Sequence, residues 1–261
     1  MKYEALITDL DGTAVAVASS GEEIDAATQE TVARAQDRGA KIGCATGRSW
    51  ELARPVVKKL GLASLCVIEG GTRIIDPLSE ESVWEKHLDD GVSNQILQEF
   101  KRYTRGGYIY MTGSEEELPL SGVSELPHSL RYLYLLDVAP DEAEQLINAI
   151  NLEYQGRAVA HITPSWSGGN AVDVHVTHAE ATKEHAVEKW RQLEGVAREH
   201  LIGMGDSGND LPLFESSGFR VATGNAIPAL KELADYVAPD CTDNALRHVI
   251  EEFFLDGTQK A

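Results

Sequence analysis

Hydrophobic and polar positions along the first part of the chain alternate in a regular way. Three apolar runs, each closed by glycine or polar residues, read as short buried strands over residues 3–10, 40–47 and 65–71. Between them, residues 20–38 and 49–61 have the apolar spacing of amphipathic helices, and Ser20-Gly-Glu-Glu23 has the spacing of a capping box. Strands alternating with helices through short, glycine-punctuated links predict a parallel, doubly wound sheet.

The pattern changes after about residue 78. The next segments read as two helices and four strands, several of them rich in tyrosine, leucine and valine. The helices are expected at residues 93–104 and 140–150, and the strands at 107–112, 129–138, 157–164 and 170–176. Strands with alternating faces favour a smaller α+β domain with a mostly antiparallel sheet.

After residue 176 the first pattern returns. Helical segments are expected at residues 182–195, 210–217, 227–234 and 242–254, and strands at 200–205, 219–224 and 235–239. The sequence therefore predicts an α/β core built from residues 1–78 and 178–261. The α+β domain, residues 79–177, is expected to be inserted between the two halves of that core.

Composition and charge narrow the classes of function. The chain has 261 residues, 43% of them hydrophobic, and a formal net charge of −19. This charge repels nucleic acid and anionic lipid, so neither is expected as a partner; it also repels phosphate unless the site holds a cation. No apolar run reaches the roughly 18 residues of a membrane helix. Three scattered cysteines suit a reducing compartment, so we expect a soluble, cytoplasmic protein; the oligomeric state is left open.

Polar residues follow the predicted core strands at the points where they end. Because the carboxyl ends of parallel strands meet at one edge of a sheet, these segments should converge. They are Asp9-Leu-Asp11-Gly-Thr13, Thr46-Gly47-Arg48 and Gly205-Asp-Ser-Gly-Asn-Asp210, and the returning half of the core also supplies Lys183. Four carboxylates would repel one another without a cation, and an all-oxygen set suits Mg²⁺.

These four segments together resemble the motifs of the haloacid dehalogenase-like (HAD) superfamily, and they span nearly the whole chain in order. The inserted domain resembles the cap (C2B type) of the Cof-type, class IIB phosphatases. "GDSGNDLPLF", "SWSGGNAVDVHV" and "VATGNAIPAL" are similar in particular to sucrose-phosphate and mannosyl-3-phosphoglycerate phosphatases. The resemblance implies a Rossmann-like core, a Mg²⁺ cofactor, and hydrolysis of a small phosphorylated metabolite, a sugar phosphate, through a phosphoaspartyl intermediate.

The resemblance also implies a role for each matched residue. Asp9 would be the nucleophile, and Asp11 would protonate the leaving alkoxide and then deprotonate water. Phosphate would be bound by Thr46, Gly47, Lys183 and Asn209. The metal would be held directly by Asp9, Asp206 and the carbonyl oxygen of Asp11, and Asp210 would complete the metal site by orienting the metal's waters.

Two positions depart from the family pattern. Glu184 follows the lysine where relatives often have glycine, and Glu69-Gly70 stands where many have Asn-Gly. Arg48 and Glu69 from the core are candidates to contact the substrate. The cap candidates are Trp166, Ser167, Gly168 and Gly169, because an indole beside hydroxyls and amides suits a sugar ring. Trp166 could equally pack in the hinge between cap and core.

Two other functions remain open at this point. A phosphomutase would use Asp9 and Asp11 but pass the phosphoryl group back to a sugar, and would need a bisphosphate activator. A phospho-acceptor signalling protein of the receiver type also combines acidic residues, Mg²⁺, threonine and lysine in an α/β fold. The length of the chain, the inserted domain and Asp11 argue against the signalling protein, because Asp11 would activate water against a phosphoaspartate.

Overall fold

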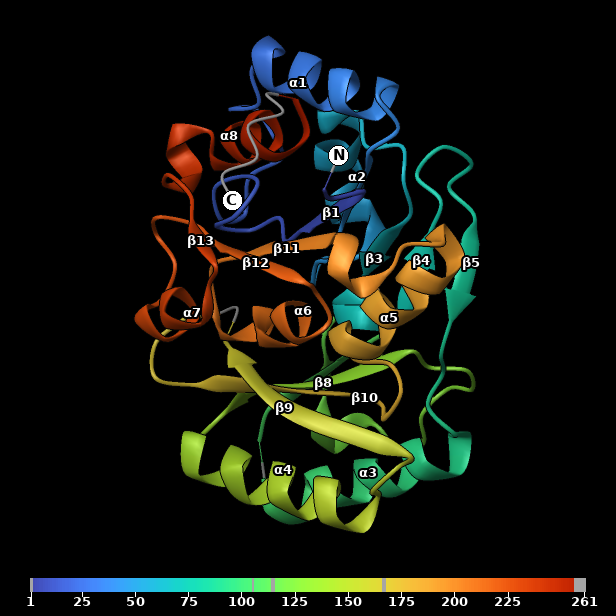
Figure 1. Cartoon of the computed structure of the whole chain (residues 1–261). Helices are drawn as coiled ribbons and strands as arrows, with labels where there is room; N and C mark the ends of the chain where they lie inside the picture. Colours follow the sequence, from blue (N-terminus) through green and yellow to red (C-terminus); the bar gives the residue numbers. More distant parts are fainter. Residues whose placement is uncertain (1, 105, 114–115, 166–167, 256–261) are drawn as a thin grey trace. The chain divides into compact units, whose positions relative to one another are not determined.

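The computed structural model describes residues 2–104, 106–113, 116–165 and 168–255 (Figure 1). The chain forms two compact units. The first contains Met1–Trp84 and Lys183–Ala261, and the second contains Glu85–Thr182. The first unit is called the core and the second the cap below.

A parallel five-stranded sheet forms the centre of the core, in the order β13-β12-β11-β1-β2. Its strands are β1 (Ala5–Thr8), β2 (Lys41–Cys44), β11 (Leu201–Gly205), β12 (Phe219–Ala222) and β13 (Tyr236–Val237). All four neighbouring pairs are parallel. β1 lies between strands from the two ends of the chain, which confirms the predicted α/β class.

The third predicted strand does not extend this parallel sheet in the expected way. β3 (Cys66–Ile68) pairs antiparallel with β4 (Arg73–Ile75), and β5 (Ser82–Glu85) follows β4 in the same sheet. β3 contacts the parallel sheet through one bridge between Ala45 and Val67. The Thr46 amide also donates to the Val67 carbonyl at 3.0 Å. β3 therefore ends beside β2.

Helices cover both faces of the core sheet, as the doubly wound prediction requires. Side chains alternate along β1, so Leu6 packs with one group of helices while Ala5 and Ile7 pack with another. The first group comprises α1 (Ala26–Asp37), α2 (Trp50–Leu60) and α8 (Ala245–Ile250); the second comprises α5 (Lys183–Glu194) and α6 (Leu211–Glu215). α7 (Pro228–Leu233) packs beside β12.

Short helical turns complete the core and one loop of the cap. The 3₁₀ turns are η1 (Glu69–Gly71), η2 (Leu120–Gly122), η3 (Arg198–His200), η4 (Gly208–Asp210) and η5 (Cys241–Asp243), and η6 (Glu251–Leu255) is a π-helical turn. One of them, η1, follows directly after β3, and another, η4, begins close to the end of β11. They occupy the edge of the sheet at which parallel strands end.

The first helix begins later than the capping-box spacing predicts. α1 starts at Ala26, and the Asp25 carboxylate accepts a hydrogen bond from the Thr28 amide at 2.7 Å. Glu23 instead accepts hydrogen bonds from the Ala16 amide and the Ser19 hydroxyl, so it holds the preceding loop. Aspartate is as good an N-cap as serine, so the helix is capped at Asp25 and the predicted start at Ser20 was wrong.

The cap is an α+β unit with an antiparallel sheet, as predicted; the strand order is β7-β6-β8-β10-β9, and β7 was not among the predicted strands. Its elements are α3 (Asp90–Tyr103), β6 (Tyr108–Met111), β7 (Leu118–Pro119), β8 (Tyr132–Val138), α4 (Pro140–Glu153), β9 (Ala158–Pro164) and β10 (Val172–His178). Leu133, Leu135 and Val174 are among the buried residues of one hydrophobic cluster with α3 and α4. These two helices therefore cover one face of the sheet (Figure 1).

A histidine pair lies between β9 and β10 of the cap. His175 is buried and stacks on Tyr134 with ring centres 4.2 Å apart. Its Nδ1 lies 3.0 Å from Nε2 of His161, and its Nε2 has no hydrogen-bond partner among the residues that the structure describes. Burial, aided by His161, lowers the pKa of His175 well below its usual value.

Acid should therefore destabilise the cap through His175. The pKa of His175 in the folded protein lies below the unfolded value of about 6.5. Its contribution to the free energy of unfolding is therefore fully present above pH 6.5 and is lost as the pH falls from there toward the folded pKa. Each pKa unit of difference corresponds to about 1.4 kcal/mol. Urea unfolding at neutral and acidic pH should show a smaller acid loss in His175→Phe than in the wild type.

A suitable control is His128→Gln, which removes an exposed cap histidine whose Nδ1 lies 2.7 Å from Asp90. The His128 side chain is exposed, so its removal should leave the acid loss as in the wild type. An equal acid loss in wild type and His175→Phe would contradict the assignment to His175.

Candidate active site

Asp9 stands where β1 ends, with only 4% of its surface exposed. Its amide donates to the Met204 carbonyl at 2.9 Å, which continues the β1–β11 ladder by one residue. The side chain is therefore held by backbone pairing at the carboxyl edge of the parallel sheet. A buried carboxylate in this position requires a compensating positive charge.

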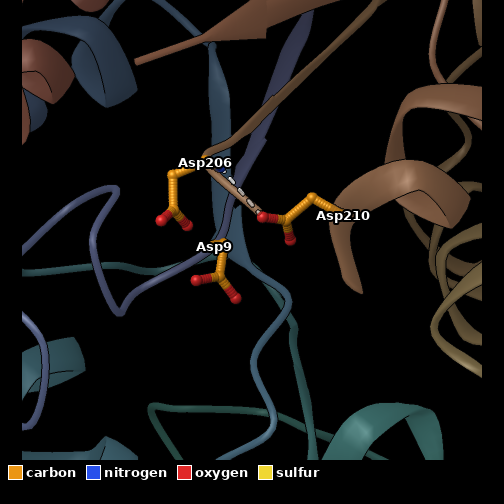
Figure 2. A group of neighbouring side chains, drawn as sticks. All are labelled: Asp9, Asp206 and Asp210. Carbon is orange, nitrogen blue, oxygen red and sulfur yellow. Dashed lines mark hydrogen bonds between the residues drawn. The ribbon is translucent and has the colours of Figure 1, made fainter. Parts of the chain in front are cut away.

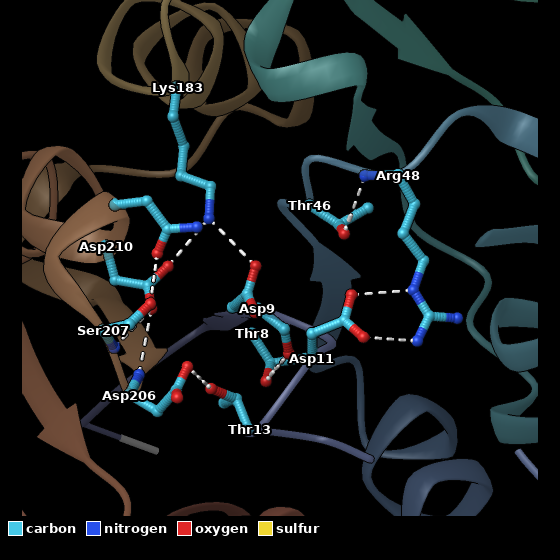
Figure 3. A network of polar contacts seen from close by, with 11 residues as sticks. Thr8, Asp9, Asp11, Thr13, Thr46, Arg48, Lys183, Asp206, Ser207 and Asp210 are labelled. Carbon is cyan, nitrogen blue, oxygen red and sulfur yellow. Dashed lines mark hydrogen bonds and ion pairs between the residues drawn. The ribbon is translucent and has the colours of Figure 1, made fainter. Parts of the chain in front are cut away.

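Lys183 supplies a positive charge to the buried carboxylates. It is the first residue of α5, and its Nζ lies 2.9 Å from Oδ1 of Asp9 and 2.7 Å from Oδ1 of Asp210 (Figure 3). Asp210 is fully buried and Lys183 is 6% exposed. Such short ion pairs away from bulk water fix both carboxylates in place.

Asp210 is further oriented by the turn that follows β11. Its Oδ2 accepts hydrogen bonds from the backbone amides of Asp206, at 2.9 Å, and Ser207, at 3.2 Å. The Ser207 hydroxyl and the Asp210 carboxylate together form a capping box at η4. Asp206 is held from the other side, because the Thr13 hydroxyl donates to its Oδ1 at 3.1 Å.

Two glycines permit this close packing of carboxylates. A Cβ on Gly12 would lie 2.5 Å from Oδ2 of Asp206, and Gly12 has a left-handed φ of 73°. A Cβ on Gly205 would lie 2.5 Å from the Cβ of Asp210. Only glycine at these two positions leaves room for the two acidic side chains.

The resulting carboxylate triad consists of Asp9, Asp206 and Asp210 (Figure 2). One oxygen from each residue can be chosen so that all three lie within 4.8 Å of one another. Three carboxylates and the oxygen-only chemistry of the cluster fit a hard divalent cation. The structure thus contains the residues that such a metal requires.

The pKa values of the triad have a clear physical origin. Burial, opposed by Lys183, raises the pKa of Asp9 to about 7, and the neighbouring charge of Asp210 also raises it. Burial and Asp210 likewise raise the pKa of Asp206. The pKa of Lys183 is also raised, because the two carboxylates outweigh the effect of its burial. A cation would favour the ionised form of each acid in this group.

Asp11 lies two residues beyond Asp9 and is held by Arg48. The guanidinium donates from Nε to Oδ2 at 2.8 Å and from Nη2 to Oδ1 at 2.6 Å, a bidentate pair visible in Figure 3. The Ala18 amide also donates to Oδ1 at 2.8 Å. Although burial raises the pKa of Asp11, the hydrogen bonds from Arg48 and Ala18 outweigh it and lower the pKa overall.

Arg48 in turn joins several loops of the site. Its Nη1 donates to the Ser19 carbonyl at 2.7 Å, and its amide donates to the Thr46 hydroxyl at 3.2 Å. Its own carbonyl accepts the Glu69 amide at 2.8 Å, while the Gly70 amide donates to the Thr46 carbonyl at 3.1 Å. The Thr46-Gly47-Arg48 loop and η1 therefore form one hydrogen-bonded edge beside Asp11.

The structure brings together most, but not all, of the sequence-predicted site residues. Asp9, Asp11, Thr46, Gly47, Arg48, Glu69, Lys183, Asp206 and Asp210 belong to the connected loops just described. Asn209 is exposed, and its side-chain oxygen accepts a hydrogen bond from the Ser207 hydroxyl. Gly168 and Gly169 are exposed turn residues of the cap, and Trp166 and Ser167 lie outside the described residues.

Three residues with clear contacts in the site were not assigned a role from the sequence. Thr13 and Ser207 hold Asp206 and Asp210, as described above. The Asn225 side chain donates to the Gly12 carbonyl at 2.7 Å and accepts the Cys241 amide at 2.9 Å. The segment "VATGNAIPAL" around Asn225 carried the family resemblance, so the signal was present without an assigned contact.

Comparison with known proteins identifies the family. The model of the haloacid dehalogenase-like hydrolases matches residues 6–119 and 127–250. The chain belongs to the haloacid dehalogenase-like hydrolases. This family membership, together with the named phosphatases among its relatives, confirms the predicted phosphoric monoester hydrolase.

Individual relatives match over nearly the whole chain. YkrA of Bacillus subtilis is 25% identical over 98% of this chain and 99% of its own length. The pyridoxal phosphate phosphatase YbhA of Escherichia coli is 24% identical over 96% of this chain and 98% of its own. A crystal structure of a haloacid dehalogenase-like hydrolase from Bacteroides thetaiotaomicron shares the fold, with a TM-score of 0.76, 20% identity, and coverage of 97% and 100% of the two chains.

No described helix has the length and apolarity required to cross a membrane.

Proposed function

We propose that this protein is a Mg²⁺-dependent phosphatase that releases phosphate from a small phosphorylated metabolite through a phosphoaspartyl intermediate on Asp9. The observation that carries the proposal is the position of Asp9. Its carboxylate is buried at the end of β1, lies 2.9 Å from the ammonium of Lys183, and belongs to a triad of acids that fits a divalent cation. Asp11, a second carboxylate, follows two residues later.

In the first step, an oxygen of Asp9 forms a bond to phosphorus and the bond to the leaving oxygen breaks. Asp11 gives its proton to that leaving oxygen, which departs as an alcohol. Lys183 offsets negative charge on Asp9 and on the phosphoryl oxygens, and the hydroxyl of Thr46 donates to one of those oxygens. The short contacts of Lys183 hold Asp9 in place before substrate arrives.

In the second step, water attacks the phosphorus of the phosphoaspartate and gives its proton to Asp11. Inorganic phosphate leaves, and Asp9 returns as a carboxylate. Both roles of Asp11 require the carboxylate to leave its bidentate pair with Arg48 at least in part. A phosphate group competes for the same planar guanidinium, so substrate binding supplies a reason for that release.

Mg²⁺ would be held by Asp9, Asp206, the Asp11 carbonyl and, through its waters, Asp210, and when bound it would neutralise phosphoryl charge. We expect Asp206→Asn to raise the Mg²⁺ concentration for half-maximal activity by about 10- to 100-fold or more, since changes to outer residues of metal sites already act on that scale. Titration of activity with Mg²⁺ measures this effect.

The control for this variant is Asp235→Asn, which removes a carboxylate paired with Arg220 at 2.8 Å outside the triad. It should leave the Mg²⁺ dependence as in the wild type. A wild-type Mg²⁺ dependence in Asp206→Asn would refute the assignment of Asp206 to the metal.

A sugar phosphate is the substrate class that we propose. Named relatives act on phosphorylated small molecules, and Arg48 and Glu69 would face the leaving group from the core. Several assignments stay predictions, and the cytoplasmic location is one of them. The others are the contacts of Gly47 and Asn209 with phosphate and those of Trp166, Ser167, Gly168 and Gly169 with the sugar.

A panel of phosphorylated metabolites, assayed with Mg²⁺ for free phosphate, tests the function. Release from a sugar monophosphate without any bisphosphate supports the proposal. Transfer between sugar positions that depends on a bisphosphate would identify a phosphomutase instead. A stable beryllofluoride complex with no turnover of any ester would identify a signalling protein.

A further inference from the structure

One loop of the core contacts both of the loops that carry the carboxylate triad. Residues 223–227 connect β12 to α7 and are called the bridging loop below. The amide of Ile227 donates to the Asp206 carbonyl at 2.9 Å. The side chain of Asn225 donates to the Gly12 carbonyl at 2.7 Å. The bridging loop therefore joins the loop that follows β1 to the loop that follows β11.

The side-chain amide of Asn225 is held in one orientation by two backbone partners. Its Nδ2 requires an acceptor, which the Gly12 carbonyl provides, and its Oδ1 accepts a hydrogen bond from the Cys241 amide at 2.9 Å. The neighbouring Gly224 amide donates to the Pro239 carbonyl at 2.8 Å, so the loop before η5 is bound as well. An aspartate of the same shape could not donate to the Gly12 carbonyl, and this position therefore uses both ends of an amide.

Asn225 bonds to the part of the chain that would present the Asp11 carbonyl to the metal. The peptide between Asp11 and Gly12 is held at its amide, which donates to the Val15 carbonyl at 2.8 Å. The next peptide is held at its carbonyl, by Asn225. Because each peptide is planar, fixing two successive peptides also fixes the direction of the Asp11 carbonyl.

The same stretch of chain sets the position of the Asp206 carboxylate. The Thr13 hydroxyl donates to its Oδ1 at 3.1 Å (Figure 3), and the missing Cβ of Gly12 leaves room for its Oδ2. Mg²⁺ demands a nearly ideal octahedron of oxygens at about 2.0–2.1 Å, so a small displacement of one ligand loop lowers the affinity. A bond that fixes the Gly12 peptide therefore acts on the direction of one proposed ligand and on the position of another.

We propose that Asn225 is a positioning residue for the metal centre, which holds the Asp11 carbonyl and the Asp206 carboxylate in the arrangement that Mg²⁺ binding requires. Its bond to Gly12 acts on the affinity for the metal and leaves the chemical step to Asp9 and Asp11. A bond with a structural role alone would stabilise the fold equally with and without the metal. This inference rests on the proposed phosphatase function and adds a residue that sets its metal requirement.

Calorimetric titration of the substrate-free protein with Mg²⁺ measures the Kd for the metal. Asn225→Ala should raise this Kd by about 10- to 100-fold, the scale on which outer residues of metal sites act. Asn225→Leu has nearly the shape of asparagine without either hydrogen bond, so it should bind Mg²⁺ as weakly as the alanine variant. At saturating Mg²⁺ both variants should release phosphate from an aryl phosphate with a kcat close to that of the wild type, because the catalytic acids are unchanged.

Asn151→Ala is the matched control. Asn151 is exposed, as Asn225 is, and its side-chain amide bonds to the carbonyl and the amide of Ala160 in the cap, at 2.9 and 2.8 Å. This variant should lose a similar amount of thermal stability in metal-free buffer but keep the wild-type Kd for Mg²⁺.

Two results would overturn the inference. One is a wild-type Kd in both Asn225 variants. The other is an Asn225 variant that unfolds in metal-free buffer while Asn151→Ala stays folded, since this would show a structural role. A wild type that binds Mg²⁺ but releases no phosphate from any ester would instead remove the proposed function, and the comparison of Kd values would still decide the role of Asn225.

Discussion

Replacing Asp9 with asparagine should abolish phosphate release, with kcat reduced by roughly 10⁶-fold, the scale on which removal of an enzymatic nucleophile acts. The amide has the shape of the carboxylate but cannot form the acyl phosphate. The fold should survive, because Lys183 keeps its 2.7 Å pair with Asp210 and an amide oxygen can still accept from the lysine. Turnover of an aryl phosphate measures the loss, and circular dichroism checks the fold.

The control for Asp9→Asn is Asp25→Asn, because Asp25 is exposed and caps α1. Asparagine is an equally good N-cap, so both stability and turnover should stay close to wild type. Turnover that persists in Asp9→Asn while the fold is intact would show that another group attacks phosphorus.

Replacing Asp11 with asparagine should slow turnover by about 10²- to 10⁴-fold, the usual contribution of a general acid or base. The side-chain amide of this variant could neither protonate the leaving oxygen nor deprotonate the water of the second step. The loss should be largest for poor leaving groups, such as alkyl phosphates, and smaller for aryl phosphates that leave without a proton. Rates for both kinds of ester over about pH 5 to 9 measure this difference.

Asp11→Asn also removes half of a bidentate ion pair, so the role of Arg48 must be separated from that of the acid. Arg48→Lys keeps the positive charge beside Asp11 but loses the planar fork. If Asp11 is the acid and base, Arg48→Lys should retain far more activity toward alkyl phosphates than Asp11→Asn does. If Asp11→Asn hydrolysed both kinds of ester at the wild-type rate across the whole pH range, both roles of Asp11 would be contradicted.

Much of the fold was predictable because the sequence carries strong local signals. Apolar runs closed by glycine located the core strands, and the return of the first pattern after residue 176 predicted an insertion. Gly61, with a φ of 70°, ends α2 where the glycine rule places the end of a helix. The start of α1 was missed because the capping-box spacing at Ser20 is also satisfied by the sequence, whereas Glu23 in fact bonds back to Ala16 and Ser19 of the preceding loop and Asp25 caps the helix.

The candidate site was predictable only as a set of strand ends. The topology of a parallel sheet dictates that Asp9 and Asp206 meet, whereas Lys183, the first residue of α5, was placed beside them by the order of the motifs. The partners of Asp11 and the left-handed conformation of Glu69, with a φ of 53°, were not predictable. No local pattern shows that the Arg48 guanidinium turns toward Asp11, and glutamate itself carries no signal for a left-handed backbone.

The central claim is that Asp9 carries the phosphoryl group during turnover, and chemical trapping tests it most directly. Asp11→Asn should accumulate the intermediate, because its hydrolysis lacks a base. After mixing with substrate and Mg²⁺, borohydride reduces an aspartyl phosphate to homoserine, which peptide mass spectrometry can locate. The account predicts homoserine at position 9 only in the presence of substrate; homoserine at another aspartate, or none at position 9 while phosphate is still released, would contradict it.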